Sequence, residues 1–72
     1  MYNTASGDDA TIAGGWWCLA SADWATVGGG ADNFATGAYA TVGGGDTNTA
    51  SGSYATAGGG YSNTVGSDYA TV

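Results

Sequence analysis

Hydrophobic and polar positions along this chain repeat every fifteen residues. The clearest copy is Tyr-Ala-Thr-Val-Gly-Gly-Gly at 39–45, and close copies occupy 24–30 and 54–60. A degraded first copy occupies 9–15, and a shortened last copy occupies 69–72. A fixed period of this length is typical of proteins whose repeats stack on one another. The 72 residues therefore form one repeat domain with rows 1–15, 16–30, 31–45, 46–60 and 61–72.

Alternation inside each row predicts strands. At 54–57 (Tyr-Ala-Thr-Ala) the small apolar residues share one parity and the aromatic residue and threonine share the other, which is the period of a strand. Valine, threonine and aromatic residues also favour strands. No window shows the spacing of a helix, and the three glycines after each strand provide the positive φ angles of a tight corner. We expect two short strands and two turns in each row.

The other half of each row carries a second motif that begins with asparagine. It occupies 3–7, 33–37, 48–52 and 63–67, and an apolar residue lies at its centre. The deviant row is Trp16-Trp17-Cys18-Leu19-Ala20-Ser21, where large or apolar residues replace small polar ones. A localised function, if the chain has one, is expected in that row.

Rows of equal length predict an all-β fold, a parallel β-solenoid of about five 15-residue coils, in which equivalent residues lie about 4.8 Å apart. The core ladder, predicted to face inward, contains Ala10, Ala25, Ala40, Ala55, Ala70, Ile12, Val27, Val42 and Val72. A turn ladder, whose side-chain amides bond the neighbouring coils, contains Asn3, Asn33, Asn48 and Asn63. An outer or intersubunit ladder contains Trp24, Tyr39, Tyr54, Tyr69, Thr26, Thr41, Thr56 and Thr71.

Two other folds fit the pattern less well. A bundle of polyproline-II helices requires glycine at every third residue, whereas the glycines here are clustered. An antiparallel, silk-like sheet predicts a short dipeptide alternation rather than a fifteen-residue unit with two different turns.

Charge excludes several classes of partner. The chain contains six aspartates and no lysine, arginine or histidine, for a net charge of −6. Neither nucleic-acid binding nor attraction to anionic lipid is expected without cations. No apolar run long enough to insert into a membrane is present. A Gly/Ala/Thr/Ser/Asn-rich repeat of low charge is typical of extracellular structural proteins, so we expect an extracellular or cell-surface location.

The sequence offers little for catalysis or metal binding. Serine and threonine have no histidine or lysine to activate them, so no catalytic residue is assigned and the chain is not expected to be an enzyme. Cys18 has no partner for an intrachain disulfide. Asp8 and Asp9 form the best pair for Ca²⁺, but the alternative is a solvated acidic edge, and no calcium-binding spacing occurs. We predict no metal site and no cofactor.

The segments 25–30, 40–45 and 50–60 resemble the YadA-like head repeat of trimeric autotransporter adhesins, a repeat that is also found in tail-fibre-like proteins. The resemblance extends over residues 3–72. It implies a left-handed parallel β-roll that packs as a trimer outside the cell and functions in adhesion. The family's commoner unit has fourteen residues and one corner glycine, whereas this chain has fifteen and three. The family's ligand-binding motif is not clearly present, so no matrix ligand is carried over.

Energetics also favour assembly. One alanine methyl and one valine side chain per coil bury little apolar area compared with an ordering cost of about 1.5 kcal/mol per residue. We therefore expect a homo-oligomer, either around a threefold axis or end to end, and the chain itself to be a fragment of a longer array or a fibre subunit. The expected function is a structural or adhesive module of a rod or fibre, whose further partners are a host surface or a glycan. The alternative is an ice-binding or glycan-binding solenoid that uses its threonine and aromatic columns.

Overall fold

The computed structural model describes residues 3–72, which form short parallel strands and no helix. Each strand contains two residues. The strands are β1 (Thr4–Ala5), β2 (Thr11–Ile12), β3 (Leu19–Ala20), β4 (Thr26–Val27), β5 (Phe34–Ala35), β6 (Thr41–Val42), β7 (Thr49–Ala50), β8 (Thr56–Ala57) and β9 (Thr64–Val65). Odd-numbered strands make a five-stranded sheet in the order β1-β3-β5-β7-β9, and even-numbered strands make a four-stranded sheet in the order β2-β4-β6-β8.

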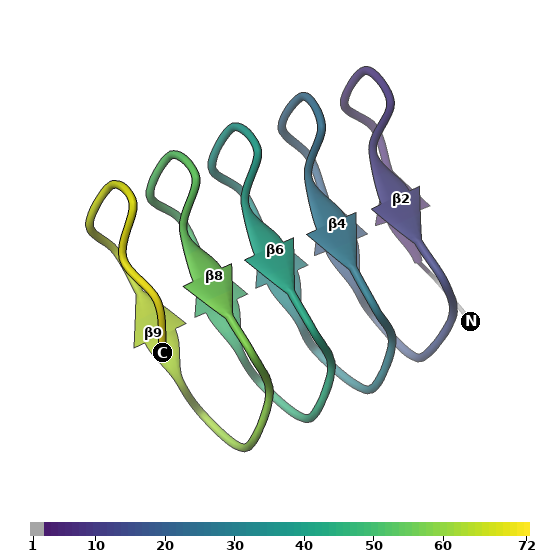
Figure 1. Cartoon of the computed structure of the whole chain (residues 1–72). Helices are drawn as coiled ribbons and strands as arrows, with labels where there is room; N and C mark the ends of the chain where they lie inside the picture. The colour runs from purple at the N-terminus through teal and green to yellow at the C-terminus, as the bar shows by residue number, and fades with distance from the viewer. Residues whose placement is uncertain (1–2) are drawn as a thin grey trace.

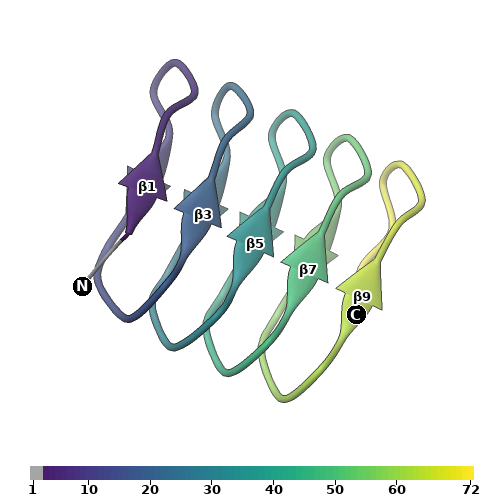
Figure 2. The same cartoon turned by 180° about the vertical axis from the view of Figure 1, so that it is seen from behind.

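Strand register confirms the predicted solenoid and its fifteen-residue coil. Thr41 of β6 pairs with Thr26 of β4 on one side and with Thr56 of β8 on the other. In Figure 1 the four-stranded sheet faces the viewer, its strands run downward from the tight loops to the broad corners, and the chain advances from right to left. Figure 2 shows the five-stranded sheet from behind, with strands that run upward while the chain advances from left to right. Both views describe a left-handed coil.

A β-turn closed by a backbone hydrogen bond between its first and fourth residues precedes each even-numbered strand. The Ala40 N–H donates to the Gly37 carbonyl oxygen at 3.0 Å, and Tyr39 inside this turn has a φ of 61°. The equivalent Tyr54 has a φ of 60°. The prediction that these tyrosines belong to the strand is therefore wrong, because a residue with positive φ cannot continue a pleated strand. The strands begin two residues later, at Thr41 and Thr56.

The glycine corner on the opposite edge requires glycine for two reasons. Gly30 and Gly45 have φ angles of 90° and 95°, which side chains rarely adopt. A Cβ atom at Gly30 would also overlap the Gly45 carbonyl oxygen, and one at Gly45 would overlap that of Gly60. The corners of successive coils therefore pack backbone against backbone.

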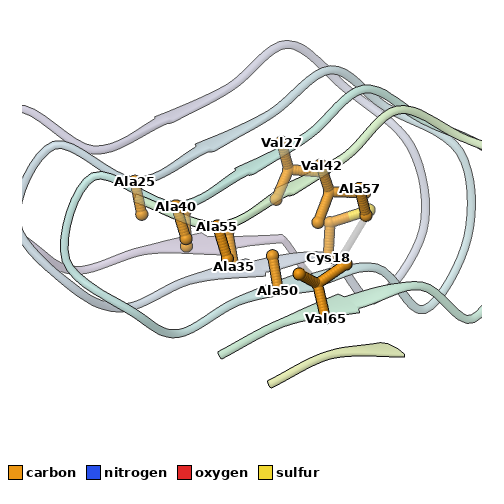
Figure 3. Packing of buried hydrophobic residues seen from close by; sticks show 11 residues of the cluster. Cys18, Ala25, Val27, Ala35, Ala40, Val42, Ala50, Ala55, Ala57 and Val65 are labelled. Carbon is orange, nitrogen blue, oxygen red and sulfur yellow. The ribbon is translucent and has the colours of Figure 1, made fainter. Parts of the chain in front are cut away.

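Small side chains fill the core between the two sheets. The molecule measures only 12 Å along its shortest principal axis, and its buried core consists mainly of alanine and valine. Figure 3 shows one row of alanines (Ala25, Ala40, Ala55) and a second row (Val27, Val42, Ala57) along the solenoid. The fully buried apolar residues are Cys18, Ala20, Ala25, Val27, Ala35, Ala40, Val42, Ala50, Ala55, Ala57 and Val65.

Members of the predicted core ladder in the outermost coils are less buried. Ala10, Ile12 and Ala70 are half-buried and pack against the core, while the side chain of Val72 is 58% exposed. These residues lie in the first or last coil of the described chain, where a neighbouring coil covers only one side. Residues at the same position in successive rows form a column. These residues belong to the columns of Ala40 and Val42, whose side chains point into the core.

Candidate functional site

The asparagine turn ladder crosslinks the glycine corners. Asn33 is completely buried, and its Nδ2 donates to the carbonyl oxygens of Gly29 at 2.6 Å and Gly45 at 2.9 Å. Its Oδ1 accepts the Asn48 N–H of the next coil at 3.0 Å. Each amide therefore bonds its own corner and the coil that follows. Within residues 3–72 no buried side-chain nitrogen or oxygen lacks a hydrogen-bond partner.

Asn48 and Asn63 repeat this geometry. Asn48 Nδ2 donates to the Gly44 and Gly60 carbonyl oxygens, and Asn48 Oδ1 accepts the Asn63 N–H at 3.0 Å. Asn63 is half-buried. Asn3 is exposed at the start of the described chain, yet its Nδ2 donates to the Gly15 carbonyl oxygen at 3.0 Å. All four predicted residues therefore lie in one column.

Cys18 is a fifth member of this column, a role that its residue type does not predict. Its backbone N–H donates to Asn3 Oδ1 at 3.1 Å, as an asparagine in this place does. Its thiol lies 3.7 Å from the Gly30 carbonyl oxygen, which is the counterpart of the Gly45 oxygen that Asn33 Nδ2 binds one coil later, and 3.6 Å from the Trp16 carbonyl oxygen. Its position fifteen residues after Asn3 identifies Cys18 as a member of the asparagine column.

Four aromatic residues form the second candidate site, which we call the aromatic rib and which consists of Trp24, Tyr39, Tyr54 and Tyr69. Adjacent ring centroids lie 6.0, 4.7 and 5.0 Å apart in chain order, and the interplanar angles do not exceed 6°. All four residues lie in the β-turns, with φ between 60° and 62°. Asp9, fifteen residues before Trp24, has a φ of 55° as well, so the positive φ belongs to the turn and does not depend on an aromatic ring.

The two inner rings of the rib, Tyr39 and Tyr54, expose ring edges rather than ring faces. Tyr39 and Tyr54 are 45% and 47% exposed, but their faces are turned toward neighbouring rings. A sugar that stacks on an aromatic side chain needs a free ring face. Between adjacent rings the rib therefore provides no such surface, although it does provide phenol groups at a spacing of about 4.8 Å.

The predicted outer ladder divides into two separate features. Threonines 26, 41 and 56 are half-buried on the outward side of the four-stranded sheet, and Thr71 is exposed and bridges to Thr56. The aromatic residues lie instead on the turn edge. A single face that contains both sets, as the alternation suggested, does not exist, because the turn separates each aromatic residue from its threonine.

The deviant second row is divided between the interior and the surface. Cys18 is buried, whereas Trp16 and Trp17 are about half exposed at the beginning of the coil. Leu19 pairs with Phe34 in neighbouring strands of the five-stranded sheet, where Phe34 is partly exposed. The row therefore contributes one internal and three outward-facing large residues.

Aspartates lie on the edges of the solenoid, and two of them cap turns. The Asp23 carboxylate accepts the Asp8 N–H at 3.0 Å, and the Asp68 carboxylate accepts the Ser53 N–H at 3.0 Å. In the described chain no group of three potential metal ligands occurs. The strands of both sheets contain no charged residue. The six negative charges therefore leave both sheet faces neutral.

Residues 3–72 enclose no pocket and contain no helix that could cross a membrane. The candidate sites are thus extended surfaces rather than cavities. Comparison of the chain with models of protein families, with curated proteins and with solved structures finds no match. The geometry of the solenoid is therefore the basis for a functional proposal.

Proposed function

We propose that this chain is an extracellular structural or adhesive repeat module that assembles into a trimeric rod or fibre. One observation carries the proposal: the largest apolar side chains lie outside a core made of alanine and valine. The tryptophans, Phe34 and the tyrosines of residues 3–72 are between 38% and 75% exposed. Aromatic side chains dominate the energetics of cores and interfaces. Among these residues Phe34 lies in the middle of the five-stranded sheet, so this face is the surface that we expect to contact another copy.

The distribution of charge indicates which surfaces can meet. Both broad faces are free of charge, whereas the turn edge carries Asp8, Asp9, Asp23 and Asp68. Copies of an acidic chain repel one another at this edge but not at the faces. The two larger dimensions are 28 and 26 Å, which multiply to a face of about 730 Å². Specific interfaces bury about 600–1,000 Å² per partner, so the area of one face lies within this range.

The resemblance to YadA-like head repeats supports a threefold arrangement and adhesion as the activity. In such an assembly each copy presents a sheet face toward the common axis and leaves an edge toward the medium. A host surface or a glycan then meets several copies at once, and weak contacts add up through multivalency. An extracellular location accords with the low charge and the Gly/Ala/Thr/Ser/Asn-rich composition.

A pair of variants with the same added charge tests the proposal. Phe34→Asp places a carboxylate in the middle of the five-stranded face, whereas Ala38→Asp places it on the turn edge, in the column of Asp8, Asp23 and Asp68. Light scattering and negative-stain imaging should show trimers or rods for the wild type and Ala38→Asp, and smaller species for Phe34→Asp. Circular dichroism checks that each variant is folded. A wild-type protein that stays monomeric contradicts the proposal.

The threonine column supports a second candidate, a solenoid that binds ice. Successive threonines at 26, 41 and 56 are in register on the outward side of the sheet, and the residues that follow each strand are glycines. A regular row of hydroxyl and methyl groups suits ordered water. Thermal hysteresis that Thr41→Tyr abolishes, and that Thr49→Tyr on the other sheet leaves intact, would favour this candidate. Absence of hysteresis in the wild type eliminates it.

A further inference from the structure

The three tyrosines of the aromatic rib are held in contact although they lie fifteen residues apart in the chain. The ring centroids of Tyr39 and Tyr54 are 4.7 Å apart with an interplanar angle of 2°, and those of Tyr54 and Tyr69 are 5.0 Å apart with an angle of 3°. All three tyrosines are at least 45% exposed. The rib thus presents closely spaced, solvent-accessible phenols, which are readily oxidised by one electron.

We propose that Tyr54 is a site of oxidative cross-linking to Tyr39 or Tyr69, with a peroxidase and hydrogen peroxide as the oxidant. Each phenol of a pair loses one electron and one proton to become a phenoxyl radical. The two radicals join through a carbon–carbon bond ortho to both oxygens, and the ring hydrogens then move to the oxygens to restore two phenols. The two electrons and two protons reduce one hydrogen peroxide to two waters, so the pair loses two hydrogen atoms in total.

Proximity favours coupling within one chain. A second radical on the same solenoid is a direct neighbour, whereas a radical on another chain must diffuse to it, so the effective concentration within the rib is far higher. The new bond joins ring edges, and the stacked rings must therefore tilt out of their parallel arrangement. Half of each side chain faces solvent, which leaves room for this movement.

The product would be a covalent staple between successive coils. A bond between Tyr39 and Tyr54 closes a loop of fifteen residues across β6 (Thr41–Val42) and β7 (Thr49–Ala50). Constraint of the unfolded chain is the usual way in which such a link stabilises a protein. The single cysteine cannot supply an intrachain link, and it is buried. The rib provides this chemistry on the exposed edge instead.

Tyr61 is a control within the same chain. It is 72% exposed, and the other residues of its column within the described chain are Trp16, Ala31 and Asp46. No ring contact to another tyrosine is observed for it in residues 3–72. Exposure alone therefore predicts oxidation of Tyr61, whereas proximity predicts coupling at Tyr54.

The test treats dilute protein with a peroxidase and hydrogen peroxide and measures dityrosine fluorescence and intact mass under denaturing conditions. The expected product is a single chain that has lost two hydrogen atoms. An endoprotease that cleaves before aspartate separates the three rib tyrosines, because Asp46 lies between Tyr39 and Tyr54 and Asp68 lies between Tyr54 and Tyr69. Fragment spectra should show Tyr54 joined to Tyr39 or Tyr69.

Two isosteric variants decide the assignment. Tyr54→Phe keeps a ring in the stack but removes the shared phenol, and the remaining tyrosines are then separated by the two ring spacings of 4.7 and 5.0 Å. Its yield of cross-linked single chains should fall at least about tenfold because the effective concentration of the partner is lost. Tyr61→Phe should match the wild type. Equal yields from Tyr54→Phe and the wild type, products joined mainly between chains, or no cross-link at all would overturn the proposal.

Discussion

Replacement of Cys18 by asparagine should stabilise the solenoid, because it restores the interrupted turn ladder. Asn33 Oδ1 accepts the Asn48 N–H, and Asn48 Oδ1 accepts the Asn63 N–H, each at 3.0 Å. Cys18 has no side-chain oxygen, so it cannot accept a hydrogen bond from the Asn33 N–H in the same way. The thiol also approaches the corner carbonyl oxygens only at 3.6 to 3.9 Å, where a thiol is a weak donor.

The size of the effect follows from the bonds gained. In Cys18→Asn the new side-chain amide would accept the Asn33 N–H and would donate to the carbonyl oxygens of Gly14 and Gly30. This is the pattern that Asn33 shows with Gly29 and Gly45. A buried hydrogen bond contributes about 1 kcal/mol net, with a range of about 0.5–1.5 kcal/mol. The bond to Gly30 replaces the weak contact of the thiol, whereas the bonds to the Asn33 N–H and to the Gly14 carbonyl oxygen are new. These two new bonds predict a gain of about 1–3 kcal/mol in the free energy of unfolding, or roughly 4–8 °C in Tm for each kcal/mol.

Thermal and urea unfolding, followed by circular dichroism in a reducing buffer, would measure this gain. Cys18→Ala is the matched control, because it removes the thiol without adding an amide, and it should be no more stable than the wild type. A Cys18→Asn protein whose Tm equals or falls below that of the wild type would refute the role of the ladder. The ladder would then be a consequence of the coil rather than a source of its stability.

Two further substitutions separate the contributions of the corner and the rib. Gly45→Ala should cost at least about 2 kcal/mol, because Gly45 has a φ of 95° and a Cβ there overlaps the Gly60 carbonyl oxygen. Gly14→Ala, where a Cβ meets no atom within 4 Å, should change stability by less than about 0.5 kcal/mol, and equal losses would contradict the account of the corner. Tyr39→Ala should cost about 1–3 kcal/mol, because it removes the ring contacts to Trp24 and Tyr54, each worth about 0.5–1.5 kcal/mol. Tyr61→Ala is the control, because it removes an exposed ring that has no ring contact among the described residues. Urea unfolding measures both variants. A loss of stability in Tyr61→Ala as large as that in Tyr39→Ala would show that stacking is not the cause.

Much of the fold was predictable because the period determines the register. Once rows of fifteen residues are stacked, Thr41 must pair with Thr56, and the parity of Ala40 and Val42 directs these residues into the core. The glycine corner and the two strands of each coil also follow from the stacking of these rows. The lower burial of Ile12 and Val72 was not evident from the column, because a column does not show which coils lack a neighbour.

The candidate site was less predictable, and propensity explains the main error. Tyrosine favours strands, so Tyr39 and Tyr54 were assigned to them, yet the hydrogen bond from Ala40 to Gly37 places the ring in a turn with positive φ. Asp9, which has no ring, adopts the same conformation at the same place in its coil, so the turn sets this φ angle, and strand propensity does not predict it. Cys18 was missed for a different reason: its side chain differs from asparagine, and only its place in the column shows the shared role.

Sedimentation equilibrium of the purified chain over a range of concentrations tests the central claim most directly. Assembly through uncharged faces predicts a species of about three times the chain mass of 6.9 kDa, or larger rods built from it. A folded, compact monomer of 6.9 kDa at every concentration would contradict the claim, because Leu19 and Phe34 on the five-stranded face would then remain without a partner.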